Sequence, residues 1–237
     1  MTQIIERFFQ SQQEMYQSLL ANTQYQLEKA VQQQGEATFL VSGGTTPKPL
    51  YCSLSKTKLP WQRIKVAMVD ERWVNPDNEA SNERLIRINL LKNLARDARL
   101  TTMKIDGQSP VEACATIENC YKKLNTPFDL TILGMGNDGH TASLFPNSIG
   151  LETGLNSEST LCCPIDAVNS AAAGKYQQRL SLTINAIKRS RQIKLLITGD
   201  KKLKTYQKAK RAGSTMEMPV RAILQLKDIP INIYWAP

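Results

Sequence analysis

The chain has 237 residues, of which 41% are hydrophobic and 22% charged, so it can bury a core of its own and has the composition of an ordinary globular protein. Lys and Arg outnumber Asp and Glu by 30 to 21, and the resulting net charge of +9 favours an anionic partner. The apolar runs are strand-sized, which argues against a membrane span, and the first twenty residues are too polar for a signal-peptide core. We therefore expect a cytoplasmic protein with one domain, residues 1–237.

Apolar runs of strand length alternate along the chain with stretches of helical period. The opening stretch, MTQIIERFFQSQQEMYQSLL, is predicted to begin an amphipathic helix. Its apolar stripe consists of Ile4, Ile5, Phe8, Phe9, Tyr16, Leu19, Leu20, Leu27 and Val31. Strands are then expected at 37–43, 64–70, 128–136, 179–184 and 192–199, with helices near 81–95, 110–124 and 200–211.

Most of these strand runs are apolar throughout, which is typical of strands that are covered on both faces. Together with the alternation of strands and helices, this predicts an α/β fold with an open, mostly parallel sheet and helices on both faces. In such sheets ligands bind beyond the carboxyl ends of the strands. The residues that follow each strand are therefore the candidates for a functional site.

The cysteines and the basic residues set limits on the partners. The five cysteines show no paired metal-ligand spacing, and Cys162 and Cys163 lie in a strand-like run, so we expect buried, reduced thiols. Residues 188–211 hold ten Lys and Arg, which would suit nucleic acid, but their single aromatic, Tyr206, provides no stacking platform. We expect a small anionic substrate, with no nucleic-acid or membrane partner, in a monomer or weak homo-oligomer.

The first strand end reads SGGTTP, residues 42–47. Its glycines let backbone N–H groups turn toward an anion, its hydroxyls add donors, and Pro47 suits a first helical turn. The spacing differs from that of a Walker loop. One interpretation is a phosphate site made by Ser42, Gly43, Gly44 and Thr45, and the other is a plain glycine turn with a helix cap.

Three successive charges, Asp70, Glu71 and Arg72, follow the next buried strand. The planar fork of an arginine can hold a phosphate or carboxylate. The alternative is an Asp–Arg ion pair that closes the edge of the sheet. Ser81 is predicted to cap the following helix, without a capping box, because Arg84 stands where Glu or Gln would be needed.

The segment GMGNDGHTASLFP, residues 134–146, contains the only histidine, His140, two positions after Asp138. Its glycines allow a substrate to approach the backbone. A sole histidine without a cysteine cluster disfavours a metal site, and a core histidine would lie in an apolar pattern rather than among glycines. General acid–base catalysis by His140, with Asp138 at the same cavity, is the favoured interpretation.

The last strand end is ITGDKK, with Lys202 in the first turn of the following helix. A cation there opposes the helix dipole, and an anion bound between it and the helix amides would account for it. Arg179, at the start of RLSLT, is a second candidate anion ligand, whereas Lys201 and Lys204 are expected to be solvated.

These segments occur in an order that resembles the motifs of the 6-phosphogluconolactonase family over about residues 36–225. The resemblance implies a Rossmann-like fold shared with glucosamine-6-phosphate deaminases and ribose-5-phosphate isomerases. It also implies hydrolysis of 6-phospho-D-glucono-1,5-lactone to 6-phosphogluconate in the oxidative pentose phosphate pathway, with neither metal nor organic cofactor. For this reaction the resemblance implies that His140 is the general base and that Asp138 orients it. The expected substrate and phosphate ligands are Ser42, Gly43, Gly44, Thr45, Asp70, Arg72, Arg179 and Lys202.

Two alternatives remain at this point. The amino-sugar phosphate deaminases carry a similar Gly-x-Gly-x-Asp-Gly-His segment, but an Ile-Ala-Phe-Asn-Glu-Pro type of sequence follows it and supplies a carboxylate. Residues 141–146, TASLFP, contain no acid, and the early loop reads SGGTTP rather than TGSTP, which favours the lactonase. A non-catalytic sugar-phosphate or nucleic-acid binder is disfavoured because Asp138 and His140 are both present.

One segment departs from the family. The family usually has a proline-containing approach to the strand that begins with Arg179, whereas residues 167–178 here read AVNSAAAGKYQQ. The shape of this loop and the contacts of Lys175 and Tyr176 are therefore left open by the resemblance.

Overall fold

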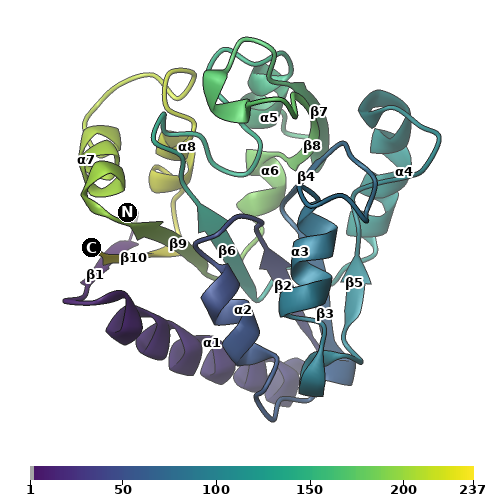
Figure 1. Ribbon diagram of the computed structural model, residues 1–237, viewed down its shortest axis with the longest axis vertical. Coiled ribbons are helices and arrows are strands. Elements are labelled where there is room, and N and C mark those ends of the chain that lie inside the picture. The colour runs from purple at the N-terminus through teal and green to yellow at the C-terminus, as the bar shows by residue number, and fades with distance from the viewer. Residues whose placement is uncertain (1–2) are drawn as a thin grey trace.

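A seven-stranded parallel sheet forms the centre of the protein, whose computed structural model describes residues 3–237 (Figure 1). Its strand order is β1-β10-β9-β6-β2-β3-β5, and every neighbouring pair is parallel. The strands are β1 (Gln3–Phe8), β2 (Ala37–Val41), β3 (Ile64–Met68), β5 (Arg99–Thr101), β6 (Leu130–Gly134), β9 (Ile193–Thr198) and β10 (Pro230–Ala236). The side chains of the five inner strands are mostly buried, as expected for strands covered on both faces, whereas the side chains of residues 4–8 in β1 and of β5 at the two edges are partly or fully exposed.

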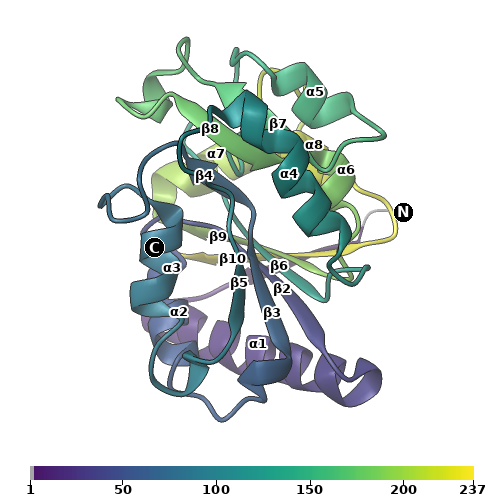
Figure 2. The same ribbon diagram turned by 90° about the vertical axis from the view of Figure 1, so that its right-hand side faces the viewer.

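Helices cover both faces of this sheet, which confirms the predicted α/β fold. Figure 2 shows α1 (Gln12–Gln34), α2 (Lys48–Leu54) and α3 (Asn82–Asn89) on one face. The other face carries a second, smaller sheet together with α4 (Pro110–Lys122), α6 (Ile184–Ile187) and α8 (Val220–Leu224). The remaining helices are α5 (Leu151–Asn156) and α7 (Asp200–Ala209). None of the helices within residues 3–237 is long and apolar enough to cross a membrane.

The second sheet corrects the prediction for residues 179–184. This run forms β8 (Gln178–Leu182), which pairs antiparallel with β4 (Asp70–Arg72) and β7 (Cys162–Asp166) in the order β4-β8-β7. Leu180 and Leu182 of this run are fully buried although the strand belongs to the small sheet and not to the large one. The charges at 70–72 likewise form a strand of their own rather than the end of β3.

The N-terminus contradicts the prediction of one continuous helix. Residues 3–8 form β1, an edge strand that pairs with β10, and α1 begins only after Ser11, whose side chain accepts a hydrogen bond from the backbone N–H of Glu14. Ile4, Ile5 and Phe8 therefore belong to a strand, while Tyr16, Leu19, Leu20, Leu27 and Val31 belong to the helix. The pairing partner lies more than 200 residues away, so the local pattern did not reveal it. Strands β5 and β10 were not predicted either.

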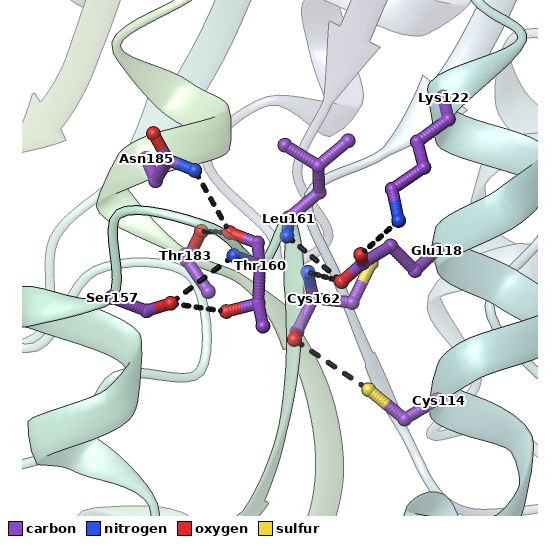
Figure 3. Close-up of polar contacts among 9 residues, drawn as sticks. All are labelled: Cys114, Glu118, Lys122, Ser157, Thr160, Leu161, Cys162, Thr183 and Asn185. Carbon is purple, nitrogen blue, oxygen red and sulfur yellow. Dashed lines mark hydrogen bonds and ion pairs between the residues drawn. The ribbon is translucent and has the colours of Figure 1, made fainter.

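A polar junction fastens the small sheet to the rest of the protein (Figure 3). The buried carboxylate of Glu118 on α4 accepts hydrogen bonds from the backbone N–H groups of Leu161 and Cys162 at the start of β7, at 2.9 and 3.4 Å. On the other side, the carbonyl oxygen of Thr160 accepts from Thr183 Oγ1 and Asn185 Nδ2 at the start of α6. The start of β7 is thereby held to two helices at once.

All five cysteines are free, but only part of the prediction about their burial holds. Cys162 and Cys163 are buried, Cys52 and Cys114 are half-buried, and Cys120 is exposed. Burial raises the pKa of the Cys163 thiol to about 12 and that of Cys114 to about 11, so neither is a thiolate near neutral pH.

Candidate active site

A cavity of about 410 Å³ opens at the carboxyl ends of the central strands. The chain leaves β2 toward β3 on one side of the sheet, whereas it leaves the neighbouring strand β6 toward β9 on the other side. The loops that follow β2 and β6 therefore diverge and leave a crevice between them, as expected for an open α/β sheet. The small sheet lies over this edge and contributes its own residues to the cavity.

The cavity brings together most of the residues that the sequence singled out. Its lining includes Ser42, Gly43, Gly44, Thr45, Asp70, Arg72, His140, Arg179 and Lys202. Asp138 is the one predicted residue outside the lining, because it lies behind the imidazole of His140. Lys201 and Lys204 are exposed, as predicted.

The loop after β2 needs glycine at two positions for different reasons. Gly44 has a φ of 93°, a backbone conformation that favours glycine. A Cβ on Gly43 would lie 1.8 Å from Oδ1 of Asn82, so the close approach of that side chain excludes any larger residue. Ser42 Oγ is buried and has no hydrogen-bond partner within residues 3–237, which leaves a donor available at the cavity wall.

Two arginines face each other across the small sheet. Arg72 on β4 and Arg179 on β8 are directly opposed in the antiparallel register, where like charges repel. Burial, together with the charge of Arg72, lowers the pKa of Arg179 to about 10 against the opposing charges of Asp70 and Glu71. Arg72 Nε is buried without a partner among the described residues. Two guanidinium groups in this arrangement favour a bound anion.

The alternative of an ion pair between Asp70 and a neighbouring arginine is wrong for residues 3–237. The Asp70 carboxylate instead accepts from Ser143 Oγ at 2.7 Å and from Asn82 Nδ2 at 3.3 Å. Arg72 Nη1 donates to the carbonyl oxygen of Ala80. The Asp70 carboxylate thus lines the cavity, and its two hydrogen-bond donors, Ser143 and Asn82, are uncharged side chains.

Glu71 has a structural role that the sequence did not reveal. Its carboxylate accepts from the backbone N–H groups of Asn82 and Glu83 at 2.7 and 2.8 Å, in the first turn of α3. The predicted cap at Ser81 is confirmed, since its side chain accepts from the N–H of Arg84. Glu71 supplies from β4 the carboxylate that a capping box would have placed within the helix.

His140 and Asp138 form a close pair in the loop after β6. Nδ1 of His140 lies 2.6 Å from Oδ1 of Asp138, and the imidazole packs against the ring of Phe145 with centroids 4.1 Å apart. Burial would raise the pKa of Asp138, but the hydrogen bond and the charge of His140 together lower it below its ordinary value. A Cβ on Gly136 would lie 2.2 Å from the imidazole, which explains a glycine at that position.

Lys202 lies in the first turn of α7 and lines the cavity, as predicted. Its ammonium is partly buried, and that burial lowers its pKa. A cation that is both desolvated and placed at the positive end of a helix is stabilised by an anion bound beside it.

Asn82 and Ser143 were not predicted as site residues. Asn82 lines the cavity. The sequence offered one clue to this residue, namely its position directly after the predicted helix cap at Ser81. Ser143 is buried and contacts the cavity residue Asp70. The unusual segment at 167–178 holds Arg179 through backbone carbonyls, since Nε donates to Tyr176 and Nη2 to Ala173. Backbone contacts of this kind do not depend on the side chains that depart from the family.

Within residues 3–237 there is no group of three or more His, Cys, Asp and Glu side chains arranged to hold a metal ion. The chemistry that the cavity offers is therefore that of an imidazole–carboxylate pair, three cations and a set of backbone and hydroxyl donors. Such a set can bind a phosphorylated substrate and move a proton at a second point on it.

The family of this protein follows from comparison with known proteins. A profile described as glucosamine-6-phosphate isomerases/6-phosphogluconolactonase matches residues 10–235, so the chain belongs to this family of sugar-phosphate enzymes. It is 35% identical over 97% of both chains to a 6-phosphogluconolactonase from Rhizobium meliloti (strain 1021). It is 36% identical to one from Pseudomonas aeruginosa, over 94% of this chain and 91% of that protein.

Solved structures agree with this assignment. The crystal structure of a 6-phosphogluconolactonase from Shewanella baltica OS155 matches with a TM-score of 0.94 and 34% identity, covering 99% of this chain and 98% of that one. A structure named as a putative 6-phosphogluconolactonase from Neisseria gonorrhoeae matches with a TM-score of 0.88 and 29% identity over 99% of this chain and all of that one.

Proposed function

We propose that this protein hydrolyses 6-phospho-D-glucono-1,5-lactone to 6-phosphogluconate in the oxidative pentose phosphate pathway. The observation that carries the proposal is the shared cavity: it has a histidine–carboxylate pair at one wall and the cations of Arg72, Arg179 and Lys202 at others. A phosphorylated cyclic ester needs the histidine–carboxylate pair for hydrolysis of the ester and the cations for binding of the phosphate. The relatives of comparable length that are named 6-phosphogluconolactonases support the same substrate.

The pair of His140 and Asp138 is suited to general-base catalysis. The Asp138 carboxylate accepts a hydrogen bond from the N–H group at Nδ1 of the imidazole. The lone pair of Nε2 is then left to take a proton from water. The water oxygen then bonds to C1 of the lactone, and the bond between C1 and the ring oxygen breaks. The ring oxygen recovers the proton from the imidazolium, so that the histidine returns to its starting state.

The phosphate supplies binding energy far from the reacting carbonyl. Ser42, Gly43, Gly44 and Thr45 offer hydroxyl and backbone donors, and Arg179 and Lys202 offer charge. Binding of the phosphate orients C1 of the lactone toward His140, so part of the binding energy serves to position the carbonyl for attack. Asp70 can accept only, so its place is at a sugar hydroxyl, while Arg72 serves the sugar or the phosphate. The N–H groups of the glycine loops, or Arg72, would stabilise the oxyanion.

A covalent route through Ser143 is disfavoured. Ser143 is fully buried, and its hydroxyl proton is directed to Asp70 rather than to His140. It therefore has no access to substrate, and the imidazole is not the acceptor of its proton.

Glucosamine-6-phosphate deamination is the competing function, because the family is named for glucosamine-6-phosphate isomerases as well as for 6-phosphogluconolactonase. We expect acid release from freshly generated phospholactone above the spontaneous rate, and no ammonia from glucosamine 6-phosphate, because residues 141–146 contain no acid. Ammonia release without lactone turnover would reverse the proposal. EDTA is expected to leave the activity unchanged, and loss of activity that zinc restores would contradict the metal-free mechanism.

The proposed location is the cytoplasm, and the proposed partner is the small sugar-phosphate lactone alone. Free thiols at all five cysteines suit a reducing compartment. Sedimentation of the purified protein at several concentrations tests the expected monomer or weak homo-oligomer.

A further inference from the structure

Ser143 lies between two oppositely charged cavity residues without lining the cavity itself. Its Oγ is 2.7 Å from Oδ2 of Asp70 on β4 and 3.5 Å from Nη1 of Arg179 on β8. The side chain is fully buried, and its backbone N–H donates to Ser181 Oγ at 3.2 Å. The loop that carries His140 is thus joined, through one hydroxyl, to both outer walls of the cavity.

The chemistry of the three groups fixes the direction of these hydrogen bonds. An ionised carboxylate only accepts and a guanidinium only donates, whereas a hydroxyl does both. Ser143 therefore donates its single proton to Asp70 and accepts from Arg179 with a lone pair. The hydroxyl satisfies part of each charge and occupies the space between them, and no direct ion pair joins Asp70 to Arg179 in the described chain.

The two charged groups are held on their other sides as well. Asn82 Nδ2 donates to Oδ1 of Asp70 at 3.3 Å and to its carbonyl oxygen at 2.9 Å. Nε and Nη2 of Arg179 donate to backbone carbonyls of the loop before β8, and its guanidinium lies over the ring of Phe145. Ser143 is the contact that sets the spacing between the two groups, because it is the side chain that touches both.

We propose that Ser143 is a positioning residue that keeps Asp70 and Arg179 apart, so that each presents its free edge to the substrate. The inference rests on the proposed function only in requiring that a sugar phosphate occupies the cavity. Removing the hydroxyl would leave the buried carboxylate short of a donor, and the guanidinium of Arg179, which contacts the same hydroxyl, would be free to pair with it. A direct pair between the two would withdraw both from the ligand.

The test measures binding separately from turnover. Calorimetric titration with 6-phosphogluconate gives Kd for the wild type, for Ser143→Ala and for Ser148→Ala. Ser148 is a matched control because it is a buried serine of the same loop whose Oγ donates only to the carbonyl of Phe145. We expect Kd to rise about tenfold or more in Ser143→Ala and to stay within about twofold in Ser148→Ala.

A double-mutant cycle separates positioning from mere stability. In Asp70→Asn the carboxylate that Ser143 serves is gone, so adding Ser143→Ala should change Kd by less than about twofold. Additive effects in this cycle, or a Ser143→Ala protein that binds like the wild type, would overturn the inference. If Ser143→Ala does not fold, Ser143→Cys keeps the volume and replaces the hydroxyl by a weak donor, and unchanged Kd in that variant would be equally decisive against it.

The same experiment keeps the two proposals apart. A wild type that binds 6-phosphogluconate but does not hydrolyse the lactone contradicts the proposed function, while the Kd values still decide the role of Ser143. A wild type that binds no 6-phosphogluconate overturns the inference about Ser143 too.

Discussion

Nδ1 of His140 lies 2.6 Å from Oδ1 of Asp138, and the backbone N–H of His140 donates to the same oxygen at 3.1 Å. One carboxylate oxygen therefore fixes both the orientation of the ring and the turn that carries it. Such a contact also selects the tautomer with the proton on Nδ1, which leaves Nε2 as the basic nitrogen.

His140→Asn should lower kcat for the phospholactone by about 10²- to 10⁴-fold, because an amide cannot take a proton from water. The protein should stay folded, since the ring is partly exposed at a loop. Initial rates, corrected for spontaneous opening of the lactone, give the comparison. If His140→Asn keeps near wild-type kcat, water is activated by another group, of which Asp138 is the first candidate.

Lys202→Ala should mainly raise KM for the phosphorylated lactone, because its proposed partner is the non-reacting phosphate. Lys201→Ala is the matched control, one residue away and exposed, and should leave KM unchanged. Turnover of unphosphorylated gluconolactone should be poor and insensitive to either change. A wild-type preference for the unphosphorylated lactone would show that the cations do not form the phosphate site.

Arg179→Ala should raise KM and also lower Tm, unlike Lys202→Ala. Its guanidinium donates to the carbonyls of Tyr176 and Ala173, which would lose buried donors on truncation. Thermal unfolding and steady-state kinetics on the same samples separate the two effects. A variant with raised KM and an unchanged Tm would mean that these backbone contacts contribute nothing measurable to folding.

Gly43→Ala should be more damaging to substrate binding than Gly44→Ala. A Cβ at position 43 meets Asn82 Oδ1 at 1.8 Å and would displace the amide that holds Asp70, whereas a Cβ at position 44 meets nothing within 4 Å. Gly44→Ala still carries the cost of a positive φ, on the order of 1 kcal/mol. KM for the phospholactone and Tm for both variants test this contrast. Equal KM values would argue against the role of Asn82 as a support for the site.

The stability of the protein should depend on pH through Lys194. This lysine is fully buried on β9, and its Nζ donates to Thr23 Oγ1 at 2.8 Å. Burial lowers its pKa from 10.5 to about 7, with a further contribution from Arg7. Between those values the unfolded chain holds a proton that the folded chain has released, so the free energy of unfolding rises with pH across this window. Below about pH 7 the folded state must carry a buried charge.

Lys194→Met removes that charge, so its Tm relative to the wild type should be highest near pH 6 and should decline toward pH 10. Lys208→Met, at an exposed position on α7, should show a difference that does not vary with pH. Parallel slopes for the two variants would mean that Lys194 titrates normally in the folded state.

Local sequence was enough to predict the elements that carry the site and their chemistry. The glycines at 43, 44 and 136 are required by backbone geometry or by a side chain pressed against them, and such requirements are visible as motifs. The strand ends of β2, β6 and β9 were predicted because buried parallel strands are apolar along their length. Since the carboxyl ends of parallel strands meet at one edge, the convergence of Ser42, His140 and Lys202 followed from the same pattern.

Only the tertiary structure decided which strands pair and which neutral side chains support the charged ones. Residues 3–8 fit a helical stripe, and they form a strand because β10 offers them a free edge. The run at 179–184 has the length of a central strand, and only its antiparallel pairing with β4 places Arg179 opposite Arg72. Ser143 and Asn82 are ordinary polar residues in sequence, and their roles arise because folding buries them against Asp70. The pairing of distant segments and the burial of single polar side chains are properties of the packed chain, so a local pattern of residues does not encode them.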